Sequence, residues 1–162
     1  MQQLSVGDRI MHPIHGVGQV IDIKHQELVA GFEHYYVIKI PAKRLTTHIP
    51  ADKLEEFGIR PVMPQADLAQ VLDILRSEPH LLPKNILLRQ RLLRQKLETG
   101  HPTQIAEAVR DLTWQEYSAH LTKVDLDLLD WGRDLLANEI ALVTNTEVAK
   151  AKERVETTLR GG

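Results

Sequence analysis

The residues best suited to a chemical role are concentrated in one basic stretch, residues 79–97. It carries no acidic side chain, and its local charge of +5 contrasts with a formal net charge of −2 for the chain; the basic residues are Lys84, Arg89, Arg91, Arg94 and Lys96. Basic side chains neutralise phosphates and release condensed counterions, so this stretch is the best candidate for binding nucleic acid. The alternative to nucleic-acid binding is that these side chains form an ordinary solvent-exposed helix face without a partner. On a helix these charges would be distributed around the axis rather than along one stripe.

Eight histidines call for a comparison with metal sites. A zinc site needs three or four convergent ligands at short spacing, often including cysteine. The chain has no cysteine, and the spacing of His12, His15, His25, His34 and His48 fits no ligand pattern. We therefore expect scattered histidines, no metal and no cofactor. A small hydrolase or metal enzyme that uses His12, His15 and His48 is a rival hypothesis.

The sequence offers no catalytic constellation. No serine lies in a glycine-flanked elbow, and no glycine-rich phosphate loop occurs. We therefore expect a protein that is not an enzyme. Phe32, Tyr35 and Tyr36 could stack on bases, but with aromatic residues at only 4% of the chain they are better explained as core. Trp114 and Trp131 lie at apolar helix positions and are also expected in the core.

Composition sets the class of protein. The 162 residues are 43% hydrophobic and 26% charged, which is typical of a folded soluble protein. The absence of cysteine fits a reducing compartment. No stretch approaches the roughly 18–20 apolar residues that span a bilayer, and the first residues lack the pattern of a secretory signal. We therefore expect a cytoplasmic protein.

Two kinds of element must position the candidate residues, and the change occurs near residue 58. Before it, short runs rich in β-branched and aromatic residues predict strands at 17–23, 35–40 and 45–49. Pro61 and Pro64 then stiffen a predicted linker, residues 59–64. The expected organisation is a small bent sheet or barrel over residues 1–58 and a helical domain over residues 65–162.

The second half has helical periodicity throughout. Apolar residues recur at helical spacing in five segments, which begin near Leu68, Asn85, Pro102, Thr122 and Thr146. Thr122 with Asp125 three residues later resembles a capping box, and Gly100 is placed to end the second helix. The predicted fold class is therefore α+β with two domains, a small β-barrel followed by a compact all-helical domain.

Several motifs occur together in one order. The chain begins with V-G-D-x-I-x-x-P-x-H-G-V-G-x-V over residues 6–20, and further matching segments lie at 35–38, 49–51, 57–62, 106–112 and 133–142. In this order they resemble the CarD/CdnL family of bacterial transcription regulators. The first half also resembles the related polymerase-interacting module of transcription-repair coupling factors.

This resemblance implies a function for each half. It implies a Tudor-like N-terminal domain that docks on the RNA polymerase β subunit, and a helical domain that touches promoter DNA in the minor groove. The family stabilises the open promoter complex near the upstream edge of the melted bubble. The implied polymerase-binding residues are Gln26, Thr47, His48 and Ile49, and the candidate DNA-binding residues are Lys84, Asn85, Ile86, Arg89 and Arg91.

One departure from the family concerns its DNA wedge. Members carry a tryptophan in a P-x-x-W arrangement, whereas this chain reads Pro83-Lys84-Asn85-Ile86. Isoleucine is among the side chains that insert between base steps, although it lacks the stacking area of indole. Ile86 is therefore either a wedge or part of the helical core. In the second case the protein could be a polymerase-binding module without functional DNA contact.

Overall fold

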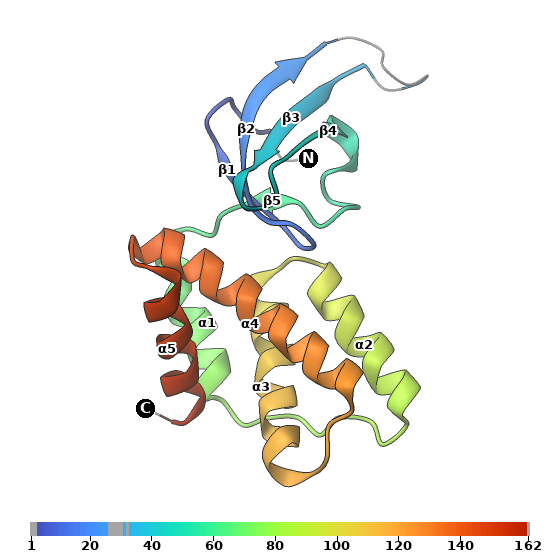
Figure 1. Ribbon diagram of the computed structural model, residues 1–162, viewed down its shortest axis with the longest axis vertical. Helices are drawn as coiled ribbons and strands as arrows, with labels where there is room; N and C mark the ends of the chain where they lie inside the picture. The colour runs from blue at the N-terminus through green and yellow to red at the C-terminus, as the bar shows by residue number, and fades with distance from the viewer. Residues whose placement is uncertain (1–2, 26–30, 32, 162) are drawn as a thin grey trace. The chain divides into compact units, whose positions relative to one another are not determined.

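The computed structural model describes residues 3–25, 31 and 33–161. The chain divides into two compact units, residues 1–62 and 63–162, called here the β unit and the helical unit (Figure 1). A sheet followed by five helices confirms the predicted α+β fold class. Among the described residues, every helix falls short of the length and apolarity that a bilayer crossing requires.

The β unit is one antiparallel sheet with the order β4-β3-β2-β1-β5. The strands are β1 (Arg9–His12), β2 (Gly16–Lys24), β3 (Tyr35–Ile40), β4 (Leu45–Pro50) and β5 (Arg60–Pro61). The predicted strand regions agree with β2, β3 and β4. Because β4 ends the order, its second backbone edge has no strand partner in the described sheet.

Alternation along the strands builds one apolar core. Val20 of β2 lies opposite Ile38 of β3, and Tyr36 lies opposite Ile49 of β4. The Tyr36 hydroxyl accepts a hydrogen bond from the backbone N–H of Leu4 at 3.1 Å. Tyr35 and Tyr36 are buried, as predicted, whereas Phe32 lies outside the described residues.

Strand β5 lies within residues 59–64, which were expected to be a linker. It pairs with β1, and Ile59 just before it belongs to the buried core. Proline is compatible with an edge strand because it does not need to donate to a ladder. The structure therefore assigns the chain up to Val62 to the β unit.

The helical unit contains α1 (Leu68–Arg76), α2 (Ile86–Glu98), α3 (Pro102–Ser118), α4 (Lys123–Thr144) and α5 (Val148–Leu159).

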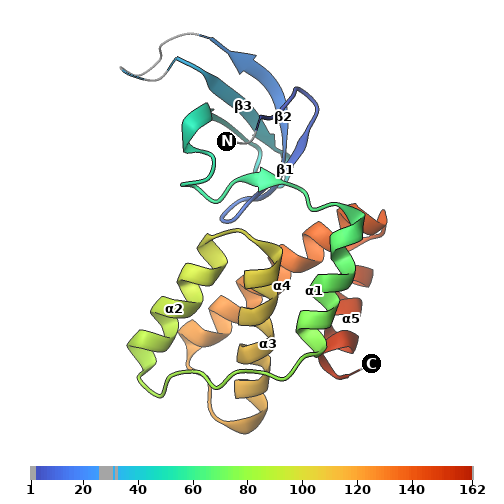
Figure 2. The same ribbon diagram turned by 180° about the vertical axis from the view of Figure 1, so that it is seen from behind.

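 Helices α3 and α4 pack against each other, α1 packs against α3, and α4 packs against α5 (Figure 2). Helix α2 contacts α3 and α4. The five predicted helical segments therefore correspond to the five observed helices.

The helix ends follow from local sequence. Thr122 forms the predicted capping box with Asp125 at the start of α4, and Gly100 adopts φ +74° just after α2. Gly132 of α4 allows a close approach to α3, because a Cβ there would lie 2.7 Å from Val109 Cγ2.

The prediction that both tryptophans belong to the core is wrong for Trp114, whose side chain is 47% exposed. Trp114 follows the buried Leu112 by two residues, about 200° around the helix, so it faces away from the core. Trp131 of α4 is half-buried.

Candidate nucleic-acid interface

The start of α2 presents an apolar side chain next to basic ones. Asn85 is the N-cap, and its Oδ1 accepts a hydrogen bond from the backbone N–H of Leu88 at 3.0 Å. This cap fixes where the helix begins, and Ile86 is its first residue. The Ile86 side chain is 47% exposed, whereas Leu93 and Leu97 of the same helix are buried. Ile86 is therefore not a core residue of the helical unit.

Further apolar side chains are exposed on or just before α2, but they do not form one face with Ile86. They are Leu81, Leu87, Leu88 and Leu92. Successive residues of a helix point about 100° apart, so Leu87, Leu88 and Leu92 lie elsewhere around the axis. Singly exposed leucines need no functional explanation, and the candidate contact is therefore Ile86 with the cations beside it.

Arg89 has a different position from the one expected of a DNA contact. Its guanidinium is buried and forms an ion pair with Asp125 of α4, with Nε also 3.3 Å from Asp125 Oδ1. Gln90 adds hydrogen bonds to Asp125 and to the hydroxyl of Thr122. Arg89 thus holds α2 against α4, and its charge is neutralised inside the protein rather than presented to a phosphate.

The environment of Asp125 keeps it ionised. Burial alone would raise its pKa, but hydrogen bonds from Arg89, from the Thr122 backbone and hydroxyl, and from Gln90 together lower the pKa below its ordinary value. Because α2 has few buried apolar residues, this ion pair is a principal attachment between α2 and the rest of the unit.

The accessible basic patch is therefore smaller than the sequence indicated. Lys84, Arg91 and Arg94 are exposed and form no ion pair with any described residue, whereas Lys96 pairs with Glu107 of α3 at 2.9 Å. Of the candidate DNA-binding residues, the structure brings Lys84, Asn85 and Ile86 together at the helix start. Arg91 lies further along α2.

A buried ion pair on α3 holds the segment that leads to α2. Arg110 Nε donates to Asp111 Oδ1 at 2.9 Å, and both side chains are buried. Arg110 also donates to the Ser77 hydroxyl at 2.8 Å, and Asp111 accepts from the backbone N–H of His80 at 2.9 Å. These two motif residues thus position the chain between α1 and α2.

A third buried charge anchors the first residue of the helical unit. Glu139 of α4 accepts a hydrogen bond from the backbone N–H of Met63 at 2.7 Å. No role was predicted for Arg110, Asp111 or Glu139. A signal was present, because Asp111 lies three positions after the buried Ala108 and Glu139 three positions after the buried Leu136, which places each on the buried side of its helix.

The implied polymerase-binding residues lie on the edge strand β4, with one exception. His48 is exposed and Thr47 is half-buried, whereas the side chain of Ile49 belongs to the core of the β unit. Ile49 can therefore contribute its backbone, but not its side chain, to a partner. Gln26 lies outside the described residues.

Four histidines of the β unit, His12, His15, His25 and His34, take part in local contacts. His12 is buried, and its Nδ1 accepts hydrogen bonds from the backbone N–H groups of Ile14 and His15 at 3.1 and 3.2 Å. Burial, and then the neighbouring His15, lower the pKa of His12 to about 4. His25 and His34 bring their Nδ1 atoms within 2.6 Å of each other. Within residues 3–25, 31 and 33–161, no three potential metal ligands come together.

Comparison with known proteins identifies the family. A model of the C-terminal domain of CarD matches residues 70–156, and a model of the CarD-like/TRCF RID domain matches residues 4–63. The chain belongs to the CarD family. This confirms the resemblance drawn from the motifs, and it makes the chain a CarD-like transcription regulator for which RNA polymerase is the expected partner.

A relative covers nearly the same length. The protein named "Putative transcription factor YdeB" from Bacillus subtilis (strain 168) is 29% identical over 141 residues, which are 86% of this chain and 91% of that protein. The two CarD models match the β unit and the helical unit in turn, so the family relationship extends through both.

Proposed function

We propose that this CarD-family chain binds the RNA polymerase β subunit through the β unit and stabilises the open promoter complex through DNA contacts of α2. The observation that carries the proposal is the half-exposed Ile86 at the capped start of α2, next to the unpaired Lys84. Ile86 also occupies the position at which the family carries its tryptophan wedge.

The polymerase contact would use the outer edge of β4. A free strand edge can pair with a strand of a partner, in which case backbone hydrogen bonds supply affinity and side chains supply specificity. His48 and Thr47 are the side chains of β4 that would select the partner. A neutral imidazole at His48 can donate or accept a hydrogen bond.

The DNA contact would combine a wedge with phosphate neutralisation. An aliphatic side chain inserted from the minor groove unstacks a base step, which is easiest at the edge of a melted region. Lys84 and Arg91 would neutralise neighbouring phosphates. Asn85 would act by fixing the helix start, because its Oδ1 is already used in the cap.

The regulatory effect follows from differential binding. A protein that binds the open promoter better than the closed one shifts the equilibrium toward the open state by its ratio of affinities. Contacts at the upstream edge of the bubble would also slow its collapse. The effect would therefore appear as a longer lifetime of the open complex.

The test compares two exposed apolar residues of α2. Ile86→Ala should shorten the lifetime of open complexes formed with RNA polymerase, and Ile86→Trp should prolong it. Leu92→Ala is the matched control, because Leu92 is 41% exposed on the same helix but lies away from the wedge position. Equal lifetimes for the Ile86→Ala and unmodified proteins would contradict the wedge.

A second candidate function is polymerase binding without functional DNA contact. It is favoured by the aliphatic residue at the wedge position and by the burial of Arg89, which leaves fewer cations on α2. Under this alternative, Thr47 and His48 variants would weaken polymerase binding, while Lys84 and Ile86 variants would leave open-complex lifetimes unchanged.

A further inference from the structure

A second basic surface lies on the helical unit, between the end of α1 and the length of α5. It is a groove of about 890 Å³ whose charged lining includes five cations and two carboxylates, a net charge of +3. The chain as a whole carries −2, so this concentration of positive charge is local. The cations are Arg76, Lys150, Lys152, Arg154 and Arg160.

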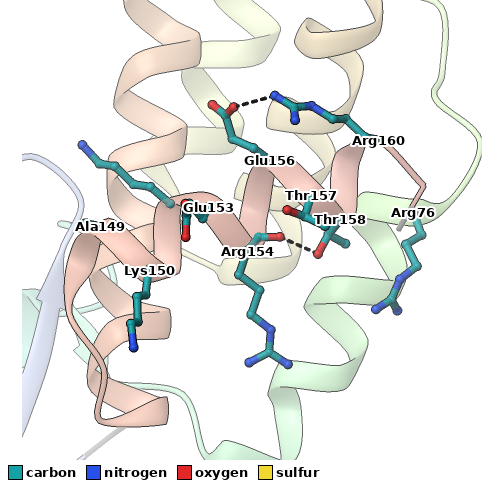
Figure 3. Close-up of a pocket in the computed structure, with 10 residues that line it drawn as sticks. Arg76, Ala149, Lys150, Glu153, Arg154, Glu156, Thr157, Thr158 and Arg160 are labelled. Carbon is teal, nitrogen blue, oxygen red and sulfur yellow. Dashed lines mark hydrogen bonds and ion pairs between the residues drawn. The ribbon is translucent and has the colours of Figure 1, made fainter.

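Three of these cations share one side of the groove. Figure 3 shows Arg76, Lys150 and Arg154 extending in the same direction, while Glu156 and Arg160 pair with each other on the other side of α5, at 3.4 Å. Lys150 and Arg154 are one helical turn apart and form no ion pair with any described residue. Arg76 pairs with Asp73 at 3.1 Å, in an exposed contact that water screens and that contributes little.

The lining indicates what kind of partner would fit. Interfaces between proteins are anchored by buried aromatic or large apolar residues and are depleted in lysine and glutamate. This groove has no large apolar lining residue and is built from charged side chains, threonines and Ala149. Lysine, arginine and threonine side chains are among the groups that contact phosphate oxygens of nucleic acid.

We propose that this α1–α5 groove binds backbone phosphates of duplex DNA as a second contact beside α2. The proposal rests on the proposed function, because it places the groove on the same DNA that α2 would meet. The groove would read no sequence, since phosphate contacts fix position and orientation only. It would set how the helical unit lies on the duplex.

The positions of the helix ends support a shared duplex. Figures 1 and 2 show that α1 and α5 end, and α2 begins, at the same end of the helical unit. Lys84 lies eight positions after Arg76, so their Cα atoms lie at most about 29 Å apart, even for a fully extended chain. One turn of B-DNA measures about 34–36 Å, so both surfaces can reach phosphates within a single turn.

The test uses the salt dependence of DNA binding by the full chain. Fluorescence anisotropy with a labelled duplex longer than two helical turns gives the slope of log K against log salt. Lys150→Ala/Arg154→Ala should reduce this slope by about 1.8, at about 0.9 per lost phosphate contact. Lys39→Ala/Lys43→Ala removes the same charge from exposed positions of the β unit and should leave the slope unchanged. Circular dichroism checks that each variant is folded.

A parallel variant, Lys84→Ala/Arg91→Ala, separates this proposal from the proposed function. If only that variant lowers the slope, the groove proposal is overturned and the α2 contact stands. If only the groove variant lowers it, the groove stands and the α2 contact fails. A slope near zero for the unmodified chain overturns both. A groove variant that loses binding to polyglutamate but keeps its DNA slope would assign the groove to an acidic protein segment and overturn the proposal.

Discussion

The two units hold their irregular segments by different means. In the β unit, buried uncharged side chains do this: His12 accepts hydrogen bonds from the backbone N–H groups of Ile14 and His15, and the Tyr36 hydroxyl accepts one from that of Leu4. In the helical unit, buried charges connect positions far apart in sequence, such as Arg89 with Asp125 and Glu139 with Met63. In the β unit, hydrogen bonds between strands already position most of the backbone. Helical hydrogen bonds lie within each helix and do not position the segments that connect one helix to the next.

The comparison shows why charge was retained in the helical core. A buried ion pair is weak evidence for stability, since well-packed apolar residues often serve as well, but breaking one leaves an uncompensated charge. Each of the three buried acidic side chains accepts a hydrogen bond from a backbone N–H outside the helices. Glu139 accepts from Met63, Asp111 from His80, and Asp125 from Thr122, the N-cap of α4. We therefore expect these charges to specify arrangement more than total stability.

The largest expected effect comes from breaking the α2–α4 ion pair. Arg89→Ala should lower the free energy of unfolding by about 3–5 kcal/mol, because Asp125 is left buried and unpaired. Urea unfolding followed by tryptophan fluorescence measures this in the helical unit, which contains both tryptophans. The double variant Arg89→Met/Asp125→Leu should recover most of the loss. A loss below about 1 kcal/mol in Arg89→Ala would remove the contrast between the units.

The next effect concerns pH and the β unit. The unfolded chain protonates His12 near pH 6.5, but the folded chain does so only near pH 4, so stability should fall as the pH drops between these values. The loss is at most about 3.5 kcal/mol, at about 1.4 kcal/mol per pKa unit. His12→Asn keeps an acceptor for the turn and should remove this dependence, while His48→Asn should not.

Asp125 should act in a lower pH window. Its pKa is lowered from 3.8 in the folded state, so its contribution is present above the unfolded pKa and is lost as the pH falls below about 3.8. Hydrogen exchange across an acid titration should therefore show the His12 contribution disappearing from the β unit before the Asp125 contribution disappears from the helical unit. The reverse order would contradict both assignments.

A smaller effect is expected where α3 and α4 approach most closely. Gly132→Ala places a methyl group 2.7 Å from Val109 Cγ2 and 3.2 Å from Leu97 Cδ2. Overpacking costs about 1–3 kcal/mol, and the helix propensity of alanine offsets about 1 kcal/mol of this. Val109→Ala should relieve the clash, so a double-mutant cycle should give a favourable coupling energy. Simple additivity would show that the helices move apart instead.

The smallest expected effect is at the cap of α4. Thr122→Ala removes the capping hydroxyl and should cost about 1 kcal/mol, whereas Thr122→Ser should keep most of the stability. Because Gln90 of α2 also donates to this hydroxyl, the Ala variant should also increase hydrogen exchange in α2. Unchanged exchange in α2 would show that Arg89 and Asp125 hold the helix without this contact.

Local signals predicted the elements well. The strand expected at residues 35–40 and the capping box at Thr122 depend on neighbours a few positions away, and both are confirmed. Strand β5 was missed because its two residues carry no periodicity and their pairing with β1 is non-local. Trp114 was misplaced because an apolar type was taken as a sign of burial.

The candidate site was harder to predict than the fold. Charge counting treated Arg89 like Lys84, since nothing near Arg89 in the sequence shows that its partner lies 36 positions further on. Conversely, the Asn85 cap and the exposure of Ile86 depend on where the helix begins, which the sequence indicated to within one residue. What a side chain does at a site depends on tertiary contacts that spacing does not encode.

The hydrogen bond between Met63 and Glu139 also has a mechanical consequence. A pull on the chain from residue 62 reaches the helical unit at Met63, whose backbone N–H is held by a side chain of α4. Load would therefore reach the longest helix of the unit through this hydrogen bond, in addition to reaching α1 through the backbone. If the β unit were held by RNA polymerase and the helical unit by DNA, tension along the chain would therefore act on α4 through this hydrogen bond as well as on α1 through the backbone.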